Sequence, residues 1–449
     1  MTTTDLIIIG AGPGGYETAI AAAREGMKVV LVEAEALGGT CLNEGCIPTK
    51  CLCRSAEVAD LMKEAATFGV VAESGGINLV EVMKRKNEVV AQLAAGVASL
   101  LKSPGITLVQ GKATFAGPHE VIVGEEHFSA PHIMIATGSS AKKLPIPGAD
   151  LPGVVTSREM LQLEQIPKRL CVIGGGVVGM EFASVFRSFG SEVSVVEYAK
   201  EILPSFDRDI AKRLRTALKR KGITFNVGAA VTEISKVDEG YKVAFVSGNK
   251  EGQVEADLVL MAVGRGPRLQ HLGLDEIGMQ YTSRGIVVDE NMQTNIEGVY
   301  AIGDVNGICP LAHAATAQGR CALYHILGKD GAPDLQLVPA AVFTVPEVAM
   351  VGHTEETASA AGLEYSIRKA FYRANGKSLS MGESEGIVKL LVGPDGLLLG
   401  AHVLGAHAAD LIHELALAMH AKMGVERIQS LIHAHPSLSE ILHDAVMNA

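Results

Sequence analysis

Two cysteines separated by four residues offer the clearest chemistry in this chain. They are Cys41 and Cys46, in residues 38–50 (GGTCLNEGCIPTK). Zinc sites usually combine C-x-x-C pairs or add downstream histidines, and no such partners stand nearby, so a redox-active disulfide is the better interpretation. Pro48 suits the first turn of a helix, which puts Cys46 near a helix N-terminus, where a thiolate is stabilised. Lys50 follows one turn later on the same face.

A second reactive segment, HAHPSLSE, stands at residues 433–440. Thiol–disulfide exchange needs a base that removes a proton from a thiol, and histidine titrates near neutral pH. Glu440, five residues after His435, could accept a hydrogen bond from the imidazole and fix its tautomer. By themselves, two histidines such as His433 and His435 near the end of a chain would favour a solvated helix cap, and only the cysteine motif makes a base the better interpretation.

The first of two glycine-rich turns predicts a dinucleotide site. Gly10, Gly12 and Gly15 fit the G-x-G-x-x-G pattern, with Gly14 beside them. These glycines permit a tight turn, a close approach to a pyrophosphate and close helix packing, and the following helix N-terminus favours phosphate. Glu33 ends the next expected strand, where its carboxylate can bind a ribose.

The second turn, at residues 174–179 (GGGVVG), predicts a second nucleotide site with Glu197 as its acid. A carboxylate here favours NAD over NADP, because NADP enzymes usually place a basic residue nearby. Tyr198 and Ala199 carry no positive charge, whereas Lys200 does, so Lys200 is the one feature that favours NADP. We expect NAD, held by Gly174, Gly176, Val178, Gly179, Glu197, Val263 and Gly264.

Each turn lies in its own copy of a β-α-β unit, so the chain contains an internal repeat. In each copy the acid stands 23 residues after the first glycine. Apolar runs and helix-like periodicity predict a strand, helix and strand at residues 5–10, 16–25 and 28–33, and again at residues 170–174, 180–189 and 192–197. A further helix is expected at residues 208–221 and a strand at residues 241–246.

From about residue 338 onward the glycine-turn pattern stops. Strands are expected at residues 386–392 and 400–404, and helices at residues 408–423 and 425–433. We therefore expect an α/β fold with two Rossmann-like domains, for FAD and NAD, and a C-terminal α+β domain. A Pro-rich segment at residues 144–148 is the expected crossover. The expected boundaries are 1–144 and 267–337 for the FAD domain, 145–266 for the NAD domain, and 338–449 for the C-terminal interface domain.

Composition excludes several classes of protein. The net charge of −11 argues against a general nucleic-acid binder. The longest apolar runs are too short to span a membrane, and the apolar residues 6–9 lack the basic region of a signal peptide, so we expect a bacterial cytoplasmic protein. Seven cysteines, four of them within residues 41–53, make a poor disulfide framework and favour a catalytic or metal-binding cluster in an intracellular protein.

Residues 38–50 resemble the active-site signature of the pyridine nucleotide–disulfide oxidoreductases, and most closely that of members that oxidise dihydrolipoamide. Residues 263–265, 311–313 and 344–349 also match, so the resemblance covers nearly the whole chain. It implies that Cys41 meets the substrate, that Cys46 lies against the flavin, and that Lys50 approaches the flavin edge and pairs with Glu181. No metal ligand set is expected.

The same resemblance implies the remaining assignments. His435, before Pro436, is the base, Glu440 orients it, and His433 is structural. In this family the base segment enters the active site of the other subunit, which implies a homodimer. Residues 135–139 and 300–304, which by sequence alone fit any strand that ends in a Gly loop, are implied to bind FAD. The implied FAD residues are Gly10, Gly12, Gly14, Gly15, Glu33, Thr40, Lys50, Thr137, Gly138, Ser139, Gly303, Asp304, Leu311, Ala312 and His313.

The implied reaction is the oxidation of dihydrolipoamide to lipoamide by NAD⁺, with substrate carried on lipoyl domains of 2-oxoacid dehydrogenase complexes or the glycine cleavage system. The alternatives are a glutathione- or mercuric-reductase-like enzyme, an NADH oxidase or transhydrogenase, and a non-catalytic scaffold. Glutathione reductases prefer NADPH, and mercuric reductases carry a C-terminal cysteine pair that residues 444–449 lack. Glu44 replaces the Val of many relatives and is expected to face solvent. Cys51 and Cys53 are expected to be small apolar helix residues.

Overall fold

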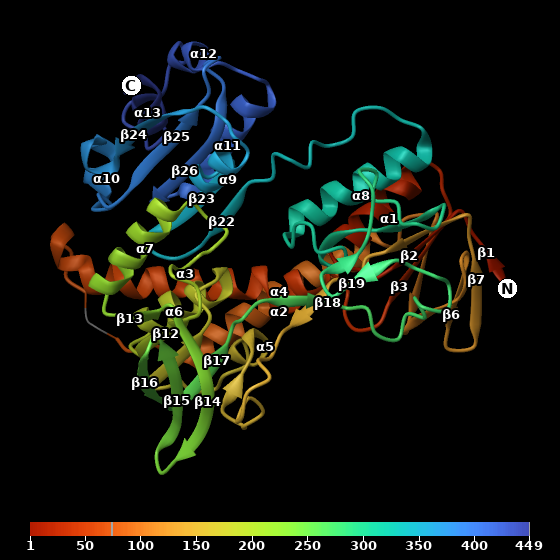
Figure 1. The fold of residues 1–449 in the computed structure, drawn as a ribbon, viewed down its shortest axis with the longest axis horizontal. Coiled ribbons are helices and arrows are strands. Elements are labelled where there is room, and N and C mark those ends of the chain that lie inside the picture. Colours follow the sequence, from red (N-terminus) through yellow and green to blue (C-terminus); the bar gives the residue numbers. More distant parts are fainter. Residues whose placement is uncertain (73–74, 449) are drawn as a thin grey trace. The chain divides into compact units, whose positions relative to one another are not determined.

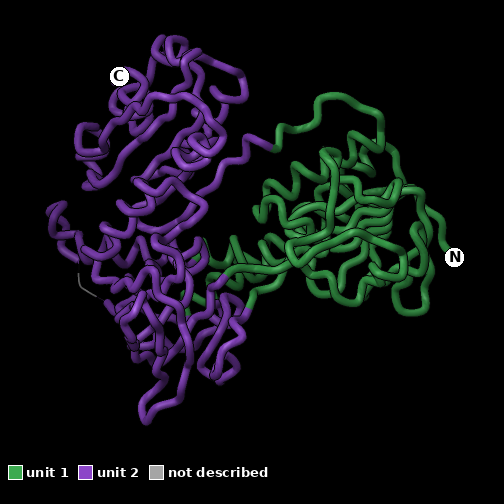
Figure 2. Tube along the Cα trace, viewed as in Figure 1, with its two compact units in different colours: residues 1–51, 81–142, 264–335 green, residues 52–80, 143–263, 336–449 purple. Residues whose placement is uncertain are grey.

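The computed structural model describes residues 1–72 and 75–448, and the chain divides into two compact units (Figure 2). The first comprises Met1–Cys51, Glu81–Lys142 and Gly264–Leu335, and the second comprises Leu52–Val80, Lys143–Val263 and Gln336–Ala449. Ala449, which ends the expected C-terminal domain, lies outside the described residues. Among the described residues, no helix is long and apolar enough to cross a membrane.

The first unit is built on a five-stranded parallel sheet (Figure 1). Its strands follow the order β21-β8-β2-β3-β4. β2 and β3 are buried along their whole lengths, which is why their sequences, LIII and VVLVE, read as continuous apolar runs instead of alternating. The bounds are β2 Leu6–Ile9, β3 Val29–Glu33, β4 Ile106–Gln110, β8 His132–Ile135 and β21 Val299–Ala301.

Helices and smaller sheets complete this unit. α1 (Pro13–Arg24) begins directly after the first glycine turn and packs against α8 (Ala312–Leu327). α3 (Cys46–Glu64) begins in this unit and continues past its boundary at Cys51. The other elements are α2 Gly39–Glu44, α4 Leu79–Leu100, η2 Gly303–Val305, β1 Thr2–Thr3, β5 Ala113–Gly117, β6 Glu120–Val123, β7 Glu126–Ser129, β9 Ser139–Ala141, β18 Arg265–Pro267, β19 Tyr281–Thr282 and β20 Gly285–Ile286.

The second unit repeats the same plan with its own five-stranded parallel sheet, of order β10-β17-β11-β12-β13. The repeat extends to backbone detail. Gly10 and Gly174 have φ of +108° and +106°, and a Cβ on either would lie 2.4 Å from a carbonyl oxygen, that of Ala136 or Ala262. Only glycine fits such a position, so the predicted internal repeat is confirmed.

The elements of this part have the following bounds: β10 Val154–Val155, α5 Ser157–Met160, β11 Arg169–Ile173, α6 Val177–Ser188, β12 Glu192–Glu197, α7 Arg208–Arg220, β13 Thr224–Val227, β14 Ala229–Val237, β15 Gly240–Ser247, β16 Lys250–Ala256 and β17 Leu258–Met261, with η1 Ala65–Phe68 earlier in the chain. β14, β15 and β16 form a separate antiparallel sheet.

The C-terminal part of the second unit is an antiparallel sheet of order β22-β23-β26-β25-β24. α11 packs on β23 and β26, while α13 packs on β24 and β25 (Figure 1). The bounds are β22 Ala340–Val342, β23 Glu347–Gly352, α9 Glu355–Ala360, β24 Ser366–Phe371, η3 Tyr372–Ala374, α10 Gly376–Met381, β25 Ile387–Val392, β26 Leu398–Gly405, α11 Ala408–His420, α12 Val425–Gln429 and α13 Glu440–Met447.

The helices expected at residues 408–423 and 425–433 both extend too far, since α11 ends at His420. α12 ends at Gln429, so residues 430–433, which were expected to be helical, belong to a loop. Beyond Gln429 the apolar side chains reach no core, since Ile432 is 99% exposed, and a helix without a buried face gains little stability from packing. The hydroxyl of Ser430 also donates to the carbonyl of Arg427 at 2.7 Å, a bond that favours helix ends.

A buried ion cluster ties α7 to the antiparallel sheet within this unit. Nζ of Lys389, whose side chain is fully buried, lies 2.7 and 2.8 Å from the carboxylate oxygens of Asp207 and also contacts Glu355. Asp207 caps α7 by accepting from the backbone N–H groups of Asp209 and Ile210. One carboxylate therefore fixes both the start of α7 and its attachment to β25.

Candidate functional site

The two cysteines stand at the junction of two helices. Cys41 lies on the short helix α2, and α3 begins at Cys46. They are not joined in a disulfide, and Cys41 is partly buried whereas Cys46 is exposed. The hydrogen bond to Cys46, then burial, and then the negative charge at Cys46 raise the pKa of the Cys41 thiol. The two thiols are therefore hydrogen-bonded to each other, and Cys46 lies at the positive end of α3.

Lys50 follows Cys46 by one turn of α3, as expected, and is partly buried. Its positive charge acts on the Cys41 thiol in the direction that lowers the pKa. The expected partner, Glu181, is buried on α6 with 3% exposure and accepts from the backbone N–H of Phe343 at 3.1 Å. Lys50 belongs to the first unit and Glu181 to the second, so this pairing stays a prediction.

Glu44, the residue that departs from many relatives, is partly buried at the end of α2 instead of fully solvated. Burial lowers the pKa of Arg265, and the charges of Asp304, Glu44 and Cys46 oppose that shift. Glu44 and Arg265 are therefore within electrostatic reach of each other. Cys51 and Cys53 are 8% and 6% exposed on α3, as expected for small apolar helix residues.

The acid of the first glycine turn is hydrogen-bonded to nearby backbone. The Glu33 carboxylate accepts hydrogen bonds of 2.7 Å from the backbone N–H groups of Ala11 and Glu35. A Cβ added to Gly12 would meet no atom within 4 Å, whereas one on Gly15 would lie 1.9 Å from the carbonyl oxygen of Gly10. The turn therefore packs tightly on its inner side and leaves backbone accessible on the other, as a pyrophosphate requires.

A second cluster in the same unit joins segments that are far apart in the sequence. The hydroxyl of Ser139 donates to Asp304 at 2.5 Å. Arg265 donates to the hydroxyl of Ser139 at 2.8 Å and to its carbonyl at 2.6 Å. The hydroxyl of Thr137 donates to the carbonyl of Arg268 at 2.9 Å. The Gly loops after β8 and β21 thus meet, and their role in binding flavin stays a prediction.

Sequence reasoning missed two residues that build this cluster. Arg265 stood in the matching stretch 263–265, and its long donor side chain was a usable signal. Gln318 is 1% exposed and accepts from the backbone N–H of Gly303 at 2.7 Å and from Asn306 at 2.9 Å. It sits mid-helix on α8, where nothing in the sequence marked it.

The expected flavin residues fit FAD because they share one unit and offer the required groups. All of them lie in the first unit. The glycine turn precedes α1, and Leu311 is the N-cap of α8, so that Ala312 and His313 lie in its first turn. Helix N-termini present backbone N–H groups to phosphates. Thr40 lies on α2, beside Cys41.

The second glycine turn repeats the geometry of the first. The Glu197 carboxylate accepts from the backbone N–H of Gly175 and, at 2.5 Å, from that of Ala199. A Cβ on Gly176 would meet nothing within 4 Å, and Val178 is 37% exposed. The residues of the second turn fit NAD in the same way that those of the first turn fit FAD. Lys200 is exposed and lies three residues after the acid. Of the expected NAD residues, all but Gly264 lie in the second unit.

His435 lies in the loop between α12 and α13. Its Nδ1 is 2.9 Å from Oε1 of Glu440, while the backbone N–H of Ser437 donates to Oε2 at 2.8 Å. The backbone N–H of Ser437, followed by the His435 side chain, lowers the pKa of Glu440. An ionised Glu440 accepts from Nδ1–H, which leaves Nε2 of His435 free to take a proton, and the His435 side chain is 80% exposed.

Nearby, Nε2 of His433 lies 2.8 Å from Oε1 of Glu414 on α11. Sequence reasoning did not single out Glu414. It stands 19 residues before His433, and only the return of the chain to α11 brings them together.

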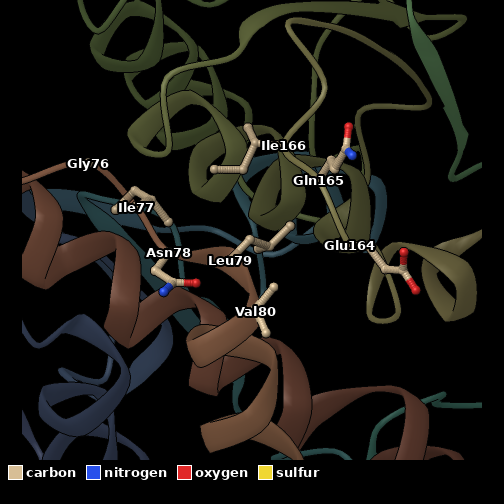
Figure 3. Close-up of a pocket in the computed structure, with 8 residues that line it drawn as sticks. All are labelled: Gly76, Ile77, Asn78, Leu79, Val80, Glu164, Gln165 and Ile166. Carbon is tan, nitrogen blue, oxygen red and sulfur yellow. The ribbon is translucent and has the colours of Figure 1, made fainter.

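A pocket in the second unit lies away from these residues. It is lined by residues 76–80 and by Glu164, Gln165 and Ile166 (Figure 3). Figure 3 shows the side chains of Ile77, Leu79 and Ile166 at its apolar wall. None of the expected site residues lines it, and in the described residues no group of three or more His, Cys, Asp or Glu side chains could hold a metal ion.

Comparisons with known proteins agree with this geometry. Residues 4–319 match the model of the pyridine nucleotide-disulphide oxidoreductase family, and residues 338–446 match the dimerisation domain of that family. The chain is 40% identical to dihydrolipoyl dehydrogenase 2 of Haloarcula marismortui. The aligned region covers all of this chain and 97% of that relative. It is 38% identical to a dihydrolipoyl dehydrogenase of Bacillus subtilis, over 99% of this chain and 98% of the relative.

Among solved structures, the HOCl-induced flavoprotein disulfide reductase RclA from Escherichia coli superposes with a TM-score of 0.88. The sequences are 31% identical, and the match covers 99% of each chain. The expected fold class, the oxidoreductase class and the cofactors FAD and NAD are confirmed by these matches and by the paired Rossmann-like sheets. The chain belongs to the pyridine nucleotide-disulphide oxidoreductase family.

Proposed function

We propose that this enzyme oxidises dihydrolipoamide to lipoamide with NAD⁺, through the Cys41–Cys46 pair. The observation that carries the proposal is the contact between the two thiols at the N-terminus of α3. It occurs in a chain about 40% identical, over its whole length, to dihydrolipoyl dehydrogenases. A pair of free, hydrogen-bonded cysteines is the state that such an oxidation leaves behind.

Substrate oxidation is a thiol–disulfide exchange with the oxidised cysteine pair. His435 takes the proton of one substrate thiol, and the resulting thiolate attacks the sulfur of Cys41. A bond between substrate and Cys41 forms while the Cys41–Cys46 bond breaks, and Cys46 leaves as a thiolate. The second substrate sulfur then displaces Cys41 and closes the lipoamide disulfide. Two electrons pass to the cysteines, one substrate proton ends on Cys41, and the other on His435.

Each protein group has one task in this scheme. Glu440 holds the tautomer of His435 in which Nε2 is the base, and it stabilises the imidazolium that forms. The N-terminus of α3 favours negative charge on Cys46, and the exposure of Cys46 leaves its sulfur accessible to a flavin. Lys50 adds a positive charge near both sulfurs, and we propose that it pairs with Glu181.

FAD, when bound, supplies a two-electron acceptor for the dithiol and a hydride donor for NAD⁺. We propose that the open backbone of Gly12, the Glu33 carboxylate and the Ser139–Asp304 cluster hold FAD. Gly176 and Glu197 would hold NAD⁺ in the same way. The Glu197 carboxylate binds ribose hydroxyls, which favours NAD⁺ over NADP⁺.

The enzyme is proposed to act as a homodimer, in which the loop of His435 serves the cysteines of the partner subunit. The match of residues 338–446 to a dimerisation domain supports this, as does the 80% exposure of the His435 side chain. Its substrate would be carried on lipoyl domains of 2-oxoacid dehydrogenase or glycine cleavage complexes. Relatives in Bacillus subtilis and Staphylococcus aureus support a bacterial cytoplasmic setting.

The test is the initial rate of NADH formation from dihydrolipoamide, with NAD⁺ and then NADP⁺ as acceptor. We expect rapid turnover with NAD⁺, slower turnover with NADP⁺, and loss of turnover in Cys41→Ser and His435→Gln. A flavin-loaded protein that does not oxidise dihydrolipoamide would exclude this substrate.

A second candidate function follows from the structural likeness to RclA, which is described as a flavoprotein disulfide reductase. In that case the reaction at the same cysteines would proceed in the opposite direction, and the pair would reduce another disulfide with electrons from NADH or NADPH. The two functions separate in one comparison, namely dihydrolipoamide oxidation against the reduction of glutathione disulfide or a protein disulfide.

A further inference from the structure

The loop that carries His435, residues 430–439, is largely exposed yet held at defined points. Ile432 is 99% exposed, and the side chain of His435 is 80% exposed. The side chain of His433 differs from both, since it is 10% exposed. A base on a solvated loop needs such anchors, because catalytic geometry must be held within a fraction of an ångström.

The anchor before the base is a histidine–carboxylate pair. Nε2 of His433 lies 2.8 Å from Oε1 of Glu414, and Glu414 belongs to α11, which packs on β23 and β26. The His433 ring also packs against the ring of His443 in α13, with 5.6 Å between the centroids and an angle of 58° between the ring planes. Nε2 of His443 in turn lies 3.1 Å from the carbonyl of Gln429, the last residue of α12. Three helices thus fix His433.

The anchor after the base is Ser437. Its carbonyl accepts from the side chain of Asn375, which is 4% exposed, at 3.0 Å. The next residue, Leu438, packs against the core of the antiparallel sheet. His435 therefore lies two residues from each anchor. Since consecutive Cα atoms are 3.8 Å apart, so short a segment between fixed ends has little freedom.

His433 itself is not arranged to exchange protons with a substrate. Nε2 contacts Glu414, and Nδ1 is buried without a hydrogen-bond partner in the described part of the chain. Nδ1 is therefore closed off from solvent. The two histidines of the HAHP segment therefore have different tasks, although their sequence context is nearly the same.

We propose that Glu414 and His433 form a positioning pair that holds the loop of His435, so that the base meets its thiol in a reactive geometry. His433 acts through the backbone of Ala434, and Glu414 acts through His433. The pair is thus a second histidine–carboxylate unit, fixed on the body of the C-terminal sheet, beside the catalytic His435–Glu440 unit. This inference deepens the proposed function and rests on it.

The test uses the holoenzyme and two reactions. Dihydrolipoamide oxidation requires the base, whereas NADH-driven reduction of ferricyanide requires flavin and nicotinamide but no base at the disulfide. The variants are His433→Leu, Glu414→Leu, the double variant, and Glu414→Gln, which keeps an acceptor oxygen. His413→Asn is the matched control, because His413 is an exposed neighbour on α11.

We expect both leucine variants to lower kcat for dihydrolipoamide by roughly tenfold to a hundredfold, with little change in KM and none in ferricyanide reduction. The double variant should be no worse than the single ones, since the residues act as a unit. Glu414→Gln should recover most of the loss, and His413→Asn should match the parent. Equal loss in both reactions, or additive losses in the double variant, would overturn the proposal.

Hydrogen exchange separates this inference from the proposed function. In the holoenzyme, backbone amides of residues 430–437 should exchange faster in His433→Leu than in the parent and the control. This readout needs no substrate. If the parent does not oxidise dihydrolipoamide, the proposed function fails while exchange still reports on the anchor. Unchanged exchange together with unchanged kcat would refute the positioning role in an enzyme that turns over.

Discussion

Nδ1 of His435 lies 2.9 Å from Oε1 of Glu440, and the same carboxylate accepts from the backbone N–H of Ser437. Residues 435–440 thus close into a ring that includes the proposed base. This ring fixes which imidazole nitrogen of His435 is available to a substrate thiol. The first prediction follows from it.

Replacement of Glu440 by Gln should lower kcat for dihydrolipoamide oxidation by about 10²-fold, because an amide cannot stabilise the imidazolium as a carboxylate does. The pKa of Glu440 is lowered in the folded protein, so its charge is present above its ordinary pKa and lost only as pH falls through the lowered value. Stopped-flow kinetics from pH 5 upward should therefore show no titration of Glu440. Glu426→Gln, on the exposed face of α12, should behave like the parent.

Glu44→Val should increase the thiolate fraction of Cys46 in the reduced enzyme. A nearby carboxylate disfavours a thiolate, and Glu44 ends α2 two residues before Cys46. The pH dependence of cysteine alkylation, followed by mass spectrometry, should shift to lower pH in Glu44→Val and also in Glu44→Gln. Glu57→Gln, farther along α3, is the control. A profile that matches the parent would mean that Arg265 already neutralises Glu44.

Glu197→Gln should weaken the binding of NAD⁺ more than the binding of NADP⁺. Each oxygen of Glu197 already accepts from a backbone N–H group, so the amide preserves part of the turn while it removes the charge that repels a 2′-phosphate. We expect kcat/KM for NAD⁺ to fall by about tenfold, the effect of about 1.4 kcal/mol, and the NADP⁺/NAD⁺ ratio to rise. Glu192→Gln, exposed at the start of the same strand, should change neither value.

Lys389→Met should destabilise the second unit by about 3–5 kcal/mol, because it leaves the buried Asp207 carboxylate without its cation. Scanning calorimetry of the holoenzyme would measure the fall in Tm. Lys369→Met, whose side chain is more exposed and bridges to Asp209 at 3.3 Å, should cost about 1 kcal/mol or less. A small effect of Lys389→Met would show that the Met side chain packs well enough to compensate.

The same cluster predicts a pH window for stability. Burial, the largest single cause, raises the pKa of Asp207. The hydrogen bond from Lys389, the charges of His402 and Lys389 and the backbone N–H of Glu355 together outweigh burial, so the net pKa is lowered. The stabilisation is thus present above the ordinary Asp value of about 3.9 and lost below it. Burial lowers the pKa of Lys389, but its bonds to Asp207 and Glu355 raise it overall. That stabilisation is present below the ordinary Lys value of about 10.4 and lost above it. The difference in Tm between the parent and Lys389→Met should therefore be largest between these limits and shrink outside them.

The sequence by itself determined the parts of this protein that are local. Both glycine turns, their acids Glu33 and Glu197, the start of α3 at Cys46 and the spacing of His435 and Glu440 follow from backbone rules that operate over a few residues or one β-α-β unit. Buried parallel strands such as β2 can also be predicted from the sequence, because burial on both faces requires an unbroken apolar run.

Tertiary structure alone decided the contacts between distant segments. Four hydrogen bonds join residues between 15 and 182 positions apart, and no local pattern encodes such pairs. They connect Arg265 with Ser139, Gln318 with Gly303, Lys389 with Asp207, and Glu414 with His433. The end of α12 at Gln429 has the same origin. Residues 430–433 have helical periodicity, but whether a helix continues depends on a surface to pack against, and at Ile432 the fold offers only solvent.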